Sequence, residues 1–318
     1  MKVNLFRCAA PLFIFHHYFY KYFAALLLEQ IKKVQRTRIF VEQNATFDIL
    51  GAAHRNIKQL RKKFDYHITG QLVGKNKLKK FADLATYKHV VQVSFEQLQS
   101  EEFQYKGKWS EAFFGNSNPV ILELGCGKGE YTVKLAKHIP EFNFIGIDIK
   151  GSRMWNGATH AKESGLKNVG FLRTNIENIC LFFGEGEVAE IWLTFPDPQM
   201  KKTRKRLTAT NFIENYRQIM APNGIVHLKS DSNFMYQYTE AMVAENQFEV
   251  LKRTNDLYHS EILDEVLSIQ TFYEKQWLDR GITIKYLSFR LNHQKSLREP
   301  EVEIEKDPYR SFGRSAKE

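Results

Sequence analysis

The sequence predicts an α/β fold built on a doubly wound, seven-stranded and mostly parallel sheet. From Pro119 onward, runs with the pattern of strands and helices alternate along the chain, which is typical of strands joined by crossover helices. A glycine-rich turn with GxGxG spacing directly follows the first of these strands. Ligands of such sheets bind beyond the carboxyl ends of the strands, where the strand order reverses, so we expect the functional site at that edge.

Apolar and β-branched runs define the strands, and a period near 3.6 residues defines the helices between them. The expected strands cover residues 119–124, 142–149, 169–174, 190–195, 224–230, 248–254 and 284–291. The expected helices cover residues 130–138, 152–164, 209–220 and 234–245. Thr208 is the expected cap of the third helix, and residues 222–224 are the expected turn before the fifth strand.

Two segments flank this alternating region. Residues 5–28 are apolar and aromatic, but charges, two histidines and Pro11 interrupt them, so we expect no membrane span. We expect residues 1–72 to be a poorly ordered or loosely helical N-terminal extension. Residues 73–291 then form the folded domain, and residues 292–318 a polar, disordered tail.

Composition restricts the class of function. The net charge of +10, from 46 Lys+Arg against 36 Asp+Glu, points to a polyanionic partner, although a basic surface without such a partner explains it equally well. Three cysteines are too few for a disulfide framework or a zinc site, which favours a cytoplasmic compartment. The absence of HExxH, GxSxG and GxxxxGK[ST] motifs excludes common metalloproteases, serine hydrolases and P-loop proteins. We expect no metal, and the sequence leaves the oligomeric state open.

The glycine turn predicts a nucleotide-type cofactor site. Gly125, Gly127 and Gly129 permit positive φ angles and a close approach of the backbone to a ligand. Asp148, at the end of the second strand, is placed to accept hydrogen bonds from ribose hydroxyls of a dinucleotide or of S-adenosylmethionine. The GxGxG spacing together with Glu123 favours S-adenosylmethionine, whose sulfonium suits a nearby acid. Asn175, after the third strand, either bonds an adenine edge or caps the following helix.

The segment TFPDPQMKKTRKR, residues 194–206, follows the fourth strand. Asp197 between two prolines is consistent with a simple tight turn, but its agreement with Glu123 and Asp148 on one edge favours an active-site acid. The cations of residues 201–206 are expected to contact phosphates, and Lys79 and Lys80 could extend that surface.

Five motifs carry a resemblance to a known family. In order and approximate spacing, ELGCGKGEYTVKLA, GIDIKGSRMWNGA, FPDPQMKKTRKRL, LKSD and TFYE resemble the tRNA (guanine-N7-)-methyltransferases, the TrmB-type class I methyltransferases. The likeness covers Val73 to about Leu291, and FPDP with its basic run is the most specific part. It implies a Rossmann-like class I fold and methyl transfer from S-adenosylmethionine to guanine N7 in tRNA. The start VGKNKLKKF looks like a family beginning, so translation could start near Val73; the alternative is a genuine membrane- or partner-binding extension, and an intact mass distinguishes them.

The resemblance also implies roles for individual residues. It makes Glu123, Asp148 and Asn175 cofactor contacts, and Asp197 both a cofactor contact and the catalytic residue. It makes six further residues substrate contacts, namely Lys201, Asp231, Thr271, Phe272, Tyr273 and Glu274. Alternatives remain: Asp231 as a helix cap, and TFYE as a helix with an aromatic core face. This chain departs from the family at two positions. It has Gln199 where the family usually has tryptophan, and Phe272 where the family usually has lysine, so one aromatic residue and one cation of the family pattern are missing.

Methylation at guanine N7 needs no general base, because that nitrogen carries a lone pair and no proton. Asp197 is therefore expected to orient guanine and to stabilise the positive charge that moves onto the purine. Two other functions remain open at this point: a small-molecule methyltransferase or NAD-dependent dehydrogenase on the same fold, and a non-catalytic RNA-binding protein.

Overall fold

The computed structural model describes residues 76–292 and 296–308. The expected N-terminal extension, residues 1–72, lies outside the described residues, and so does Val73. Among the described residues, no helix combines the length and apolar character that crossing a membrane requires.

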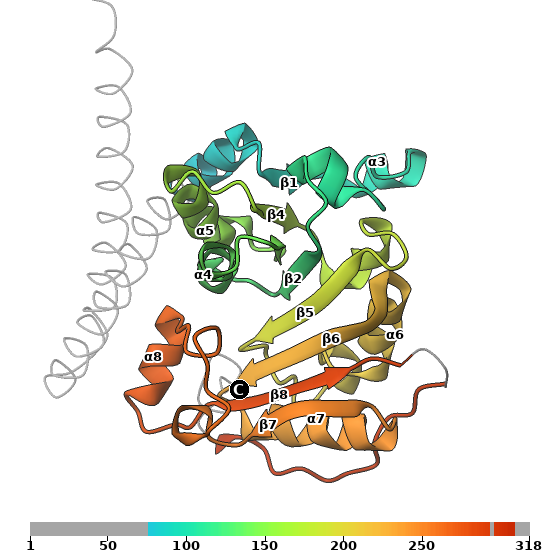
Figure 1. Cartoon of the computed structure of the whole chain (residues 1–318), viewed down its shortest axis with the longest axis vertical. Coiled ribbons are helices and arrows are strands. Elements are labelled where there is room, and N and C mark those ends of the chain that lie inside the picture. Colours follow the sequence, from blue (N-terminus) through green and yellow to red (C-terminus); the bar gives the residue numbers. More distant parts are fainter. Residues whose placement is uncertain (1–75, 293–295, 309–318) are drawn as a thin grey trace, which may run out of the picture. The chain divides into compact units, whose positions relative to one another are not determined.

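The described chain is organised around one mixed sheet of eight strands (Figure 1). Their order is β1-β4-β3-β2-β5-β6-β8-β7. The strands are β1 (Val90–Gln92), β2 (Val120–Leu124), β3 (Asn143–Ile147), β4 (Val169–Arg173), β5 (Val188–Thr194), β6 (Met220–Ser230), β7 (Glu249–Thr254) and β8 (Lys285–Arg290). β8 is antiparallel to both its neighbours, and the other pairs are parallel. The order reverses at β2, which pairs with β3 on one side and β5 on the other.

This topology confirms the predicted fold class. The seven expected strands correspond to β2–β8, and the start of β6 differs most from its expected position. β1, which pairs in parallel with β4 at the sheet edge, is an eighth strand that the sequence pattern did not predict. A three-residue strand carries too little pattern to be recognised, because alternation needs about four residues to show.

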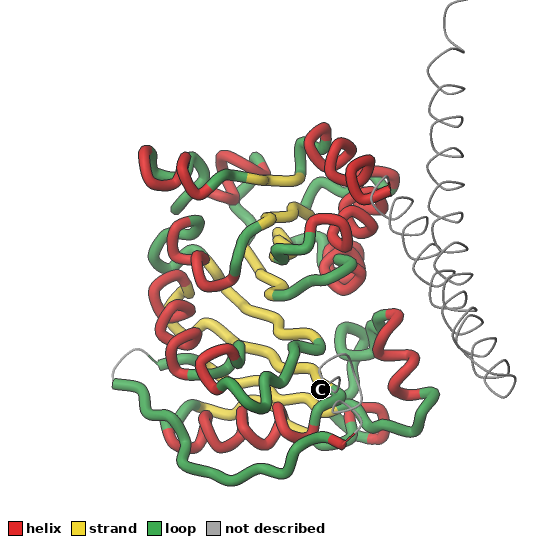
Figure 2. The backbone as a smooth tube through the Cα atoms, turned by 180° about the vertical axis from the view of Figure 1, so that it is seen from behind, coloured by secondary structure: helices red, strands yellow, loops and turns green. Residues whose placement is uncertain are grey.

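Helices lie on both sides of the sheet (Figure 2). The α-helices are α3 (Phe95–Ser100), α4 (Glu130–His138), α5 (Gly151–Glu163), α6 (Thr210–Ile219), α7 (Asn233–Glu245) and α8 (Phe272–Leu278), and residues 76–86 are also helical. The other helical segments are η1 (Trp109–Phe114), η2 (Ile176–Leu181), η3 (Thr203–Lys205) and η4 (Leu257–His259).

The side chains of β2 divide between two hydrophobic cores. Val120, Leu122 and Leu124 pack in the core that also contains side chains of α6 and α7. Ile121 packs in the core formed with α4 and α5. Because successive side chains of a strand point to opposite faces, this division shows that β2 is buried on both faces, as a doubly wound sheet requires.

Two local predictions need correction. Thr208 does not cap α6: its hydroxyl is buried against the Thr239 hydroxyl at 2.8 Å, and Ala209 occupies the cap position. The expected turn at residues 222–224 does not separate α6 from a strand. Asn223 has a φ of +66°, and it lies in an irregular register within β6.

The C-terminal residues 296–308 differ from the expected disordered tail. Glu299 accepts hydrogen bonds from the Thr210 N–H and hydroxyl, at 2.8 and 2.7 Å. Asp307 is buried and accepts a bond from the Phe234 N–H at 3.0 Å. Carboxylates that bond helix N–H groups give this polar segment contacts that its composition did not reveal. Residues 293–295 and 309–318 of the expected tail lie outside the described part of the chain.

Candidate active site

The turn between β2 and α4 holds all three glycines in the left-handed region. The φ angles of Gly125, Gly127 and Gly129 are +77°, +56° and +68°. A Cβ added at Gly125 would meet no heavy atom of the described residues within 4 Å, so this glycine borders open space. A Cβ at Gly129 would lie 2.6 Å from the Phe171 ring and 3.2 Å from Cα of Gly157. Gly129 is therefore also required for the packing of α4 on α5, whereas Gly125 leaves room for a ligand.

Asp148 ties this turn to the end of β3. Its Oδ2 accepts a hydrogen bond from the Gly127 N–H at 3.0 Å, and its Oδ1 accepts one from the Lys150 N–H at 2.7 Å. The side chain is half-buried. Because each carboxylate oxygen can accept a second bond, Asp148 can hold the glycine turn and still accept from a ligand hydroxyl.

Glu123 is buried beneath the same turn, with only 3% of its surface exposed. Its carboxylate accepts hydrogen bonds from the Thr132 N–H at 2.8 Å and from the hydroxyls of Thr132 and Thr194. Burial raises the pKa of the Glu123 carboxyl from 4.5 to about 7, although these donors act in the opposite direction. Glu123 therefore joins β2, α4 and β5. Neither threonine was predicted from the sequence, since neither lies in a glycine or acidic motif.

This environment predicts a pH-dependent contribution of Glu123 to stability. A carboxyl whose pKa is higher in the folded than in the unfolded chain stabilises the fold below its unfolded pKa, and that contribution is lost as pH rises through the folded pKa. Denaturant titrations should therefore show Glu123→Gln gaining about 3 kcal/mol relative to the wild type between about pH 4 and pH 8. A stability difference that does not change with pH would contradict this prediction.

Asn175 lies at the carboxyl edge next to these residues. It follows β4, is exposed and occupies the cap position of η2. Its side chain makes no capping hydrogen bond with the described residues. The capping alternative is therefore wrong in this structure, and the adenine contact stays a prediction.

Asp197 is displayed on a constrained loop after β5. Phe195 and Gln199 have φ angles of +54° and +46°, and Pro196 and Pro198 are buried while Asp197 is exposed. Its Oδ1 accepts a hydrogen bond from the Gln199 N–H at 3.1 Å, which is an Asx-turn. The carboxylate therefore shapes its own loop, and its exposure leaves it accessible to a ligand.

The basic loop, residues 199–206, continues from Asp197. Lys201, Lys202 and Arg204 are exposed, and Lys205 pairs with Glu177 at 2.8 Å. Arg206 is only 7% exposed, which corrects the expectation that the whole run contacts phosphates. A buried guanidinium cannot reach an external phosphate, so three exposed cations and the partly engaged Lys205 remain for a polyanion.

The TFYE motif contains two residues that bond within the protein, Thr271 and Glu274, and two exposed aromatic residues. Thr271 is the N-cap of α8 and forms a capping box with Glu274. Glu274 is completely buried and pairs with Lys229 at 2.8 Å, and the Tyr258 hydroxyl donates to it at 2.6 Å. Both side chains are engaged within the protein, and their expected base contacts stay predictions. Lys229, in the LKSD motif, is a partner that the sequence analysis did not identify.

The exposed half of TFYE lies against the glycine turn. Phe272 and Tyr273 are 50% and 46% exposed. The Lys128 ammonium lies 4.0 Å from the Phe272 ring centroid and 5.2 Å from that of Tyr273. Glu130 accepts a hydrogen bond from the Phe272 N–H at 2.7 Å. Two exposed rings next to a cofactor turn are suited to stacking on a base.

Asp231 is not the cap of the following helix. It follows β6 and is completely buried, while Ser232 is the N-cap of α7 and accepts from the Met235 N–H at 2.9 Å. The Lys285 ammonium donates to the Asp231 carbonyl at 3.2 Å. The capping alternative is therefore wrong, and the substrate contact of Asp231 stays a prediction.

Comparison with known proteins assigns the fold and site to a class. Residues 117–287, from just before β2 into β8, match the family described as "Putative methyltransferase". The parallel sheet, the glycine turn and the acids at its carboxyl edge thus define an α/β methyltransferase, with S-adenosylmethionine as the methyl donor.

Closely similar relatives identify the family. A tRNA (guanine-N(7)-)-methyltransferase of Bacteroides thetaiotaomicron is 59% identical over 243 residues, 76% of this chain and 96% of that protein. A protein of the same name from Porphyromonas gingivalis is 54% identical over 236 residues, 73% of this chain and 97% of that protein. Among solved structures, the 16S rRNA methyltransferase KamB matches with a TM-score of 0.43 and 16% identity, over 64% of this chain and 96% of that chain. The two relatives show that the chain belongs to the tRNA (guanine-N(7)-)-methyltransferase family, as its motifs predict.

The residues at the turn fit a sulfonium cofactor better than a dinucleotide. Glu130 lies in the first turn of α4, where a pyrophosphate would otherwise be held, and Glu123 and Asp148 add two more acids. An acidic surrounding suits a cation without phosphates. Within the described ranges, no group of three or more His, Cys, Asp or Glu residues could hold a metal ion.

Proposed function

We propose that this chain transfers a methyl group from S-adenosylmethionine to N7 of the variable-loop guanine at tRNA position 46, forming 7-methylguanosine. The observation that carries the proposal is that the segment after β5 is hydrogen-bonded beneath the cofactor turn and then carries both Asp197 and the exposed cations. Thr194 bonds Glu123 beneath the turn, Asp197 is exposed three residues later, and the cations of the basic loop follow at once. S-adenosylmethionine supplies the methyl group from a sulfonium centre.

Asp197 is the catalytic residue in this proposal. Its carboxylate accepts hydrogen bonds from the guanine N1–H and amino group, which orients N7 toward the cofactor site. As positive charge develops on the purine, a fixed carboxylate stabilises it more strongly in the transition state than in the ground state. The buried prolines on both sides reduce the conformational freedom that would be lost on holding this geometry.

The surrounding residues bind the cofactor, the tRNA phosphates and a base. Asp148, Asn175 and the backbone at Gly125 hold the cofactor, while Glu123 supports the turn from below. Lys201, Lys202 and Arg204 contact tRNA phosphates, and Phe272 and Tyr273 stack on a base that has left its tertiary contacts, a step that costs a few kcal/mol. A tRNA substrate places the enzyme in the cytoplasm.

A methylation assay tests the proposal. Purified protein is incubated with labelled S-adenosylmethionine and unmodified tRNA transcript, and the nucleosides are separated. We expect 7-methylguanosine, and we expect none from a transcript with adenine at position 46. Folded protein that binds S-adenosylmethionine but forms no 7-methylguanosine on tRNA would overturn the proposal. In that case the hypothesis of a small-molecule methyltransferase becomes the better one, although it does not explain the basic loop.

The exposed cations of the basic loop should set the salt dependence of tRNA binding. Each phosphate contact contributes a slope of roughly 0.9 in log Kd against log salt, so replacing Lys201, Lys202 and Arg204 by glutamine should lower the slope by about 2 to 3. Filter binding over a range of salt concentrations measures the slope. The matched control replaces Lys108, Lys137 and Lys167, which are exposed near the amino ends of the strands. Equal slopes for the two triple variants would contradict this surface.

A further inference from the structure

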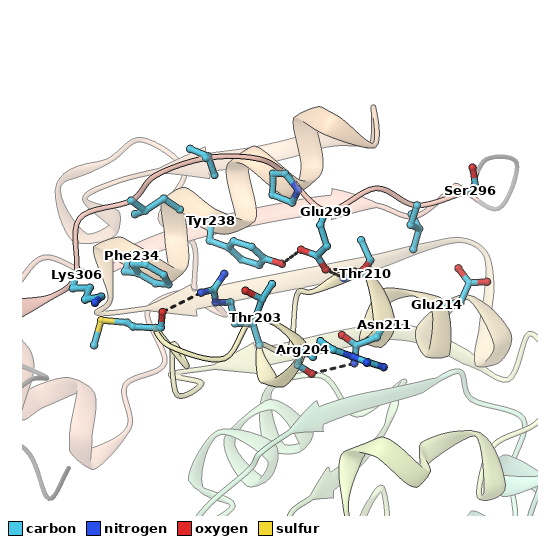
Figure 3. Close-up of a pocket in the computed structure, with 16 residues that line it drawn as sticks. Thr203, Arg204, Thr210, Asn211, Glu214, Phe234, Tyr238, Ser296, Glu299 and Lys306 are labelled. Carbon is cyan, nitrogen blue, oxygen red and sulfur yellow. Dashed lines mark hydrogen bonds between the residues drawn. The ribbon is translucent and has the colours of Figure 1, made fainter.

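The C-terminal strap, residues 296–308, lies along a groove beside the basic loop (Figure 3). The groove has a volume of about 990 Å³, and its lining includes Glu299 from the strap, Arg204 and Arg206 from the basic loop, and Tyr238 from α7. The strap thus faces the loop that follows Asp197 and carries the exposed cations.

Both ends of the strap are fastened to α7. At one end, the Asn246 side chain donates to the Arg298 carbonyl at 2.9 Å and accepts from the Arg298 N–H at 2.8 Å. At the other end, Asp307 accepts from the Ser232 hydroxyl and from the Phe234 N–H, at the start of α7. The strap therefore spans the length of α7.

Glu299 directly follows Arg298 at the first of these two ends and links two helices. One oxygen of its carboxylate accepts from the N–H and hydroxyl of Thr210 at the start of α6, and the other accepts from the Tyr238 hydroxyl on α7. The pKa of Tyr238 is raised, mainly by burial and next by the hydrogen bond to Glu299. Its hydroxyl therefore stays protonated and donates. Figure 3 shows Glu299 between Thr210 and Tyr238.

Tyr238 continues the connection into the basic loop. Its ring centroid lies 4.4 Å from the Arg206 guanidinium, which also lies 4.8 Å from the Phe234 ring. Arg206 in turn donates to the Met200 carbonyl at 3.3 Å. Among the described residues, Nε of Arg206 has no hydrogen-bond partner. The guanidinium is thus held by ring faces and by one loop carbonyl, and it depends on the placement of Tyr238.

We propose that Glu299 is a positioning residue for tRNA recognition, acting through Tyr238 and Arg206 to hold the basic loop. This inference rests on the proposed function and deepens it. The direction in which tRNA affinity changes when Glu299 is neutralised distinguishes a positioning role from a purely electrostatic effect. Removing an acid near a polyanion site should strengthen tRNA binding, whereas loss of positioning should weaken it.

Glu299→Gln tests the proposal with a matched control. Glutamine keeps an acceptor for the Thr210 N–H but loses the carboxylate oxygen that accepts from Tyr238. We expect the KM for tRNA to rise roughly fivefold to tenfold, the range of one lost hydrogen bond, with kcat and the Kd for S-adenosylmethionine unchanged. Glu303→Gln makes the same charge change at an exposed position of the strap and should leave KM unchanged or lower. Tyr238→Phe should match Glu299→Gln, and the double variant should show no further rise.

Hydrogen exchange provides a readout that does not require tRNA. In the free protein, Glu299→Gln should speed the exchange of the amides of Lys202, Lys205 and Arg206, which bond within the basic loop, while the amides of α4 stay unchanged. Glu303→Gln should leave all of them unchanged. Equal exchange in the two variants, or equal KM values, overturns the proposal. Absence of 7-methylguanosine from the wild type would remove the proposed function, and hydrogen exchange would still decide whether Glu299 positions the loop.

Discussion

Replacing Asp197 by asparagine is expected to lower kcat by roughly a hundredfold or more, which is the usual effect of removing one preorganised electrostatic group. Asparagine keeps an oxygen that accepts from the Gln199 N–H, so the Asx-turn of the loop survives the change. The negative charge that stabilises the developing cationic purine is lost. Single-turnover methylation with saturating tRNA measures the effect.

The comparison with two further variants separates charge from loop geometry. Asp197→Ala removes the turn acceptor as well, so it should lose turnover and also disturb the basic loop. Glu185→Gln makes a similar charge change at an exposed position before β5 and should leave kcat unchanged. The Kd of Asp197→Asn for tRNA should equal or fall below that of the wild type. Turnover within threefold of the wild type would show that Asp197 is not the stabiliser.

The positions of the candidate residues that the sequence predicted are those set by a local turn or by the ends of parallel strands. The glycine turn and Asp148 follow adjacent parallel strands, and parallel strands bring their carboxyl ends to one edge whatever the rest of the chain does. The same rule placed Asp197 at the end of β5, next to β2. Local backbone chemistry and sheet topology together were sufficient for these residues.

Partners that are distant in the sequence could not be predicted. Glu123 and Thr194 are 71 residues apart, and Tyr238 and Glu299 are 61 apart, yet each pair is hydrogen-bonded. No spacing rule connects such residues, because their contact depends on how helices pack on the completed sheet. For the same reason, composition did not reveal the contacts that residues 296–308 make with α6 and α7.

Burial also changed the meaning of three acids. Glu123, Asp231 and Glu274 lie in motifs that imply ligand contacts, but their side chains are buried within the protein. Sequence reveals that a carboxylate is present near the site without revealing which way it points. Glu123 and Glu274 bond neighbouring elements within the protein, and Asp197 is the exposed acid of its loop.

The buried pair of Lys229 and Glu274 provides the largest expected effect on stability. Both side chains are completely buried, and the Lys229 ammonium also donates to the carbonyls of Leu267 and Ile269, at 2.7 and 2.8 Å. Burial lowers the pKa of Lys229, while Glu274 opposes that shift and favours the charged form. Removing either partner leaves an uncompensated charge in the core, so Lys229→Met should lower the free energy of unfolding by about 3 to 5 kcal/mol.

The double variant distinguishes a coupled pair from two independent contributions. Because Lys229→Met/Glu274→Met removes both charges, its loss should be smaller than the sum of the single losses by at least about 1 kcal/mol. Lys275→Met, at an exposed position next to Glu274 on α8, should change stability by less than about 0.5 kcal/mol. Denaturant titrations of the wild type, Lys229→Met, Glu274→Met, the double variant and Lys275→Met measure these values, and additive losses would contradict the coupling. The helix α8, which contains Glu274, begins with Phe272 and Tyr273. The Lys229→Met variant should therefore bind tRNA more weakly while it still binds the cofactor, because the buried pair supports the helix that carries the two exposed rings.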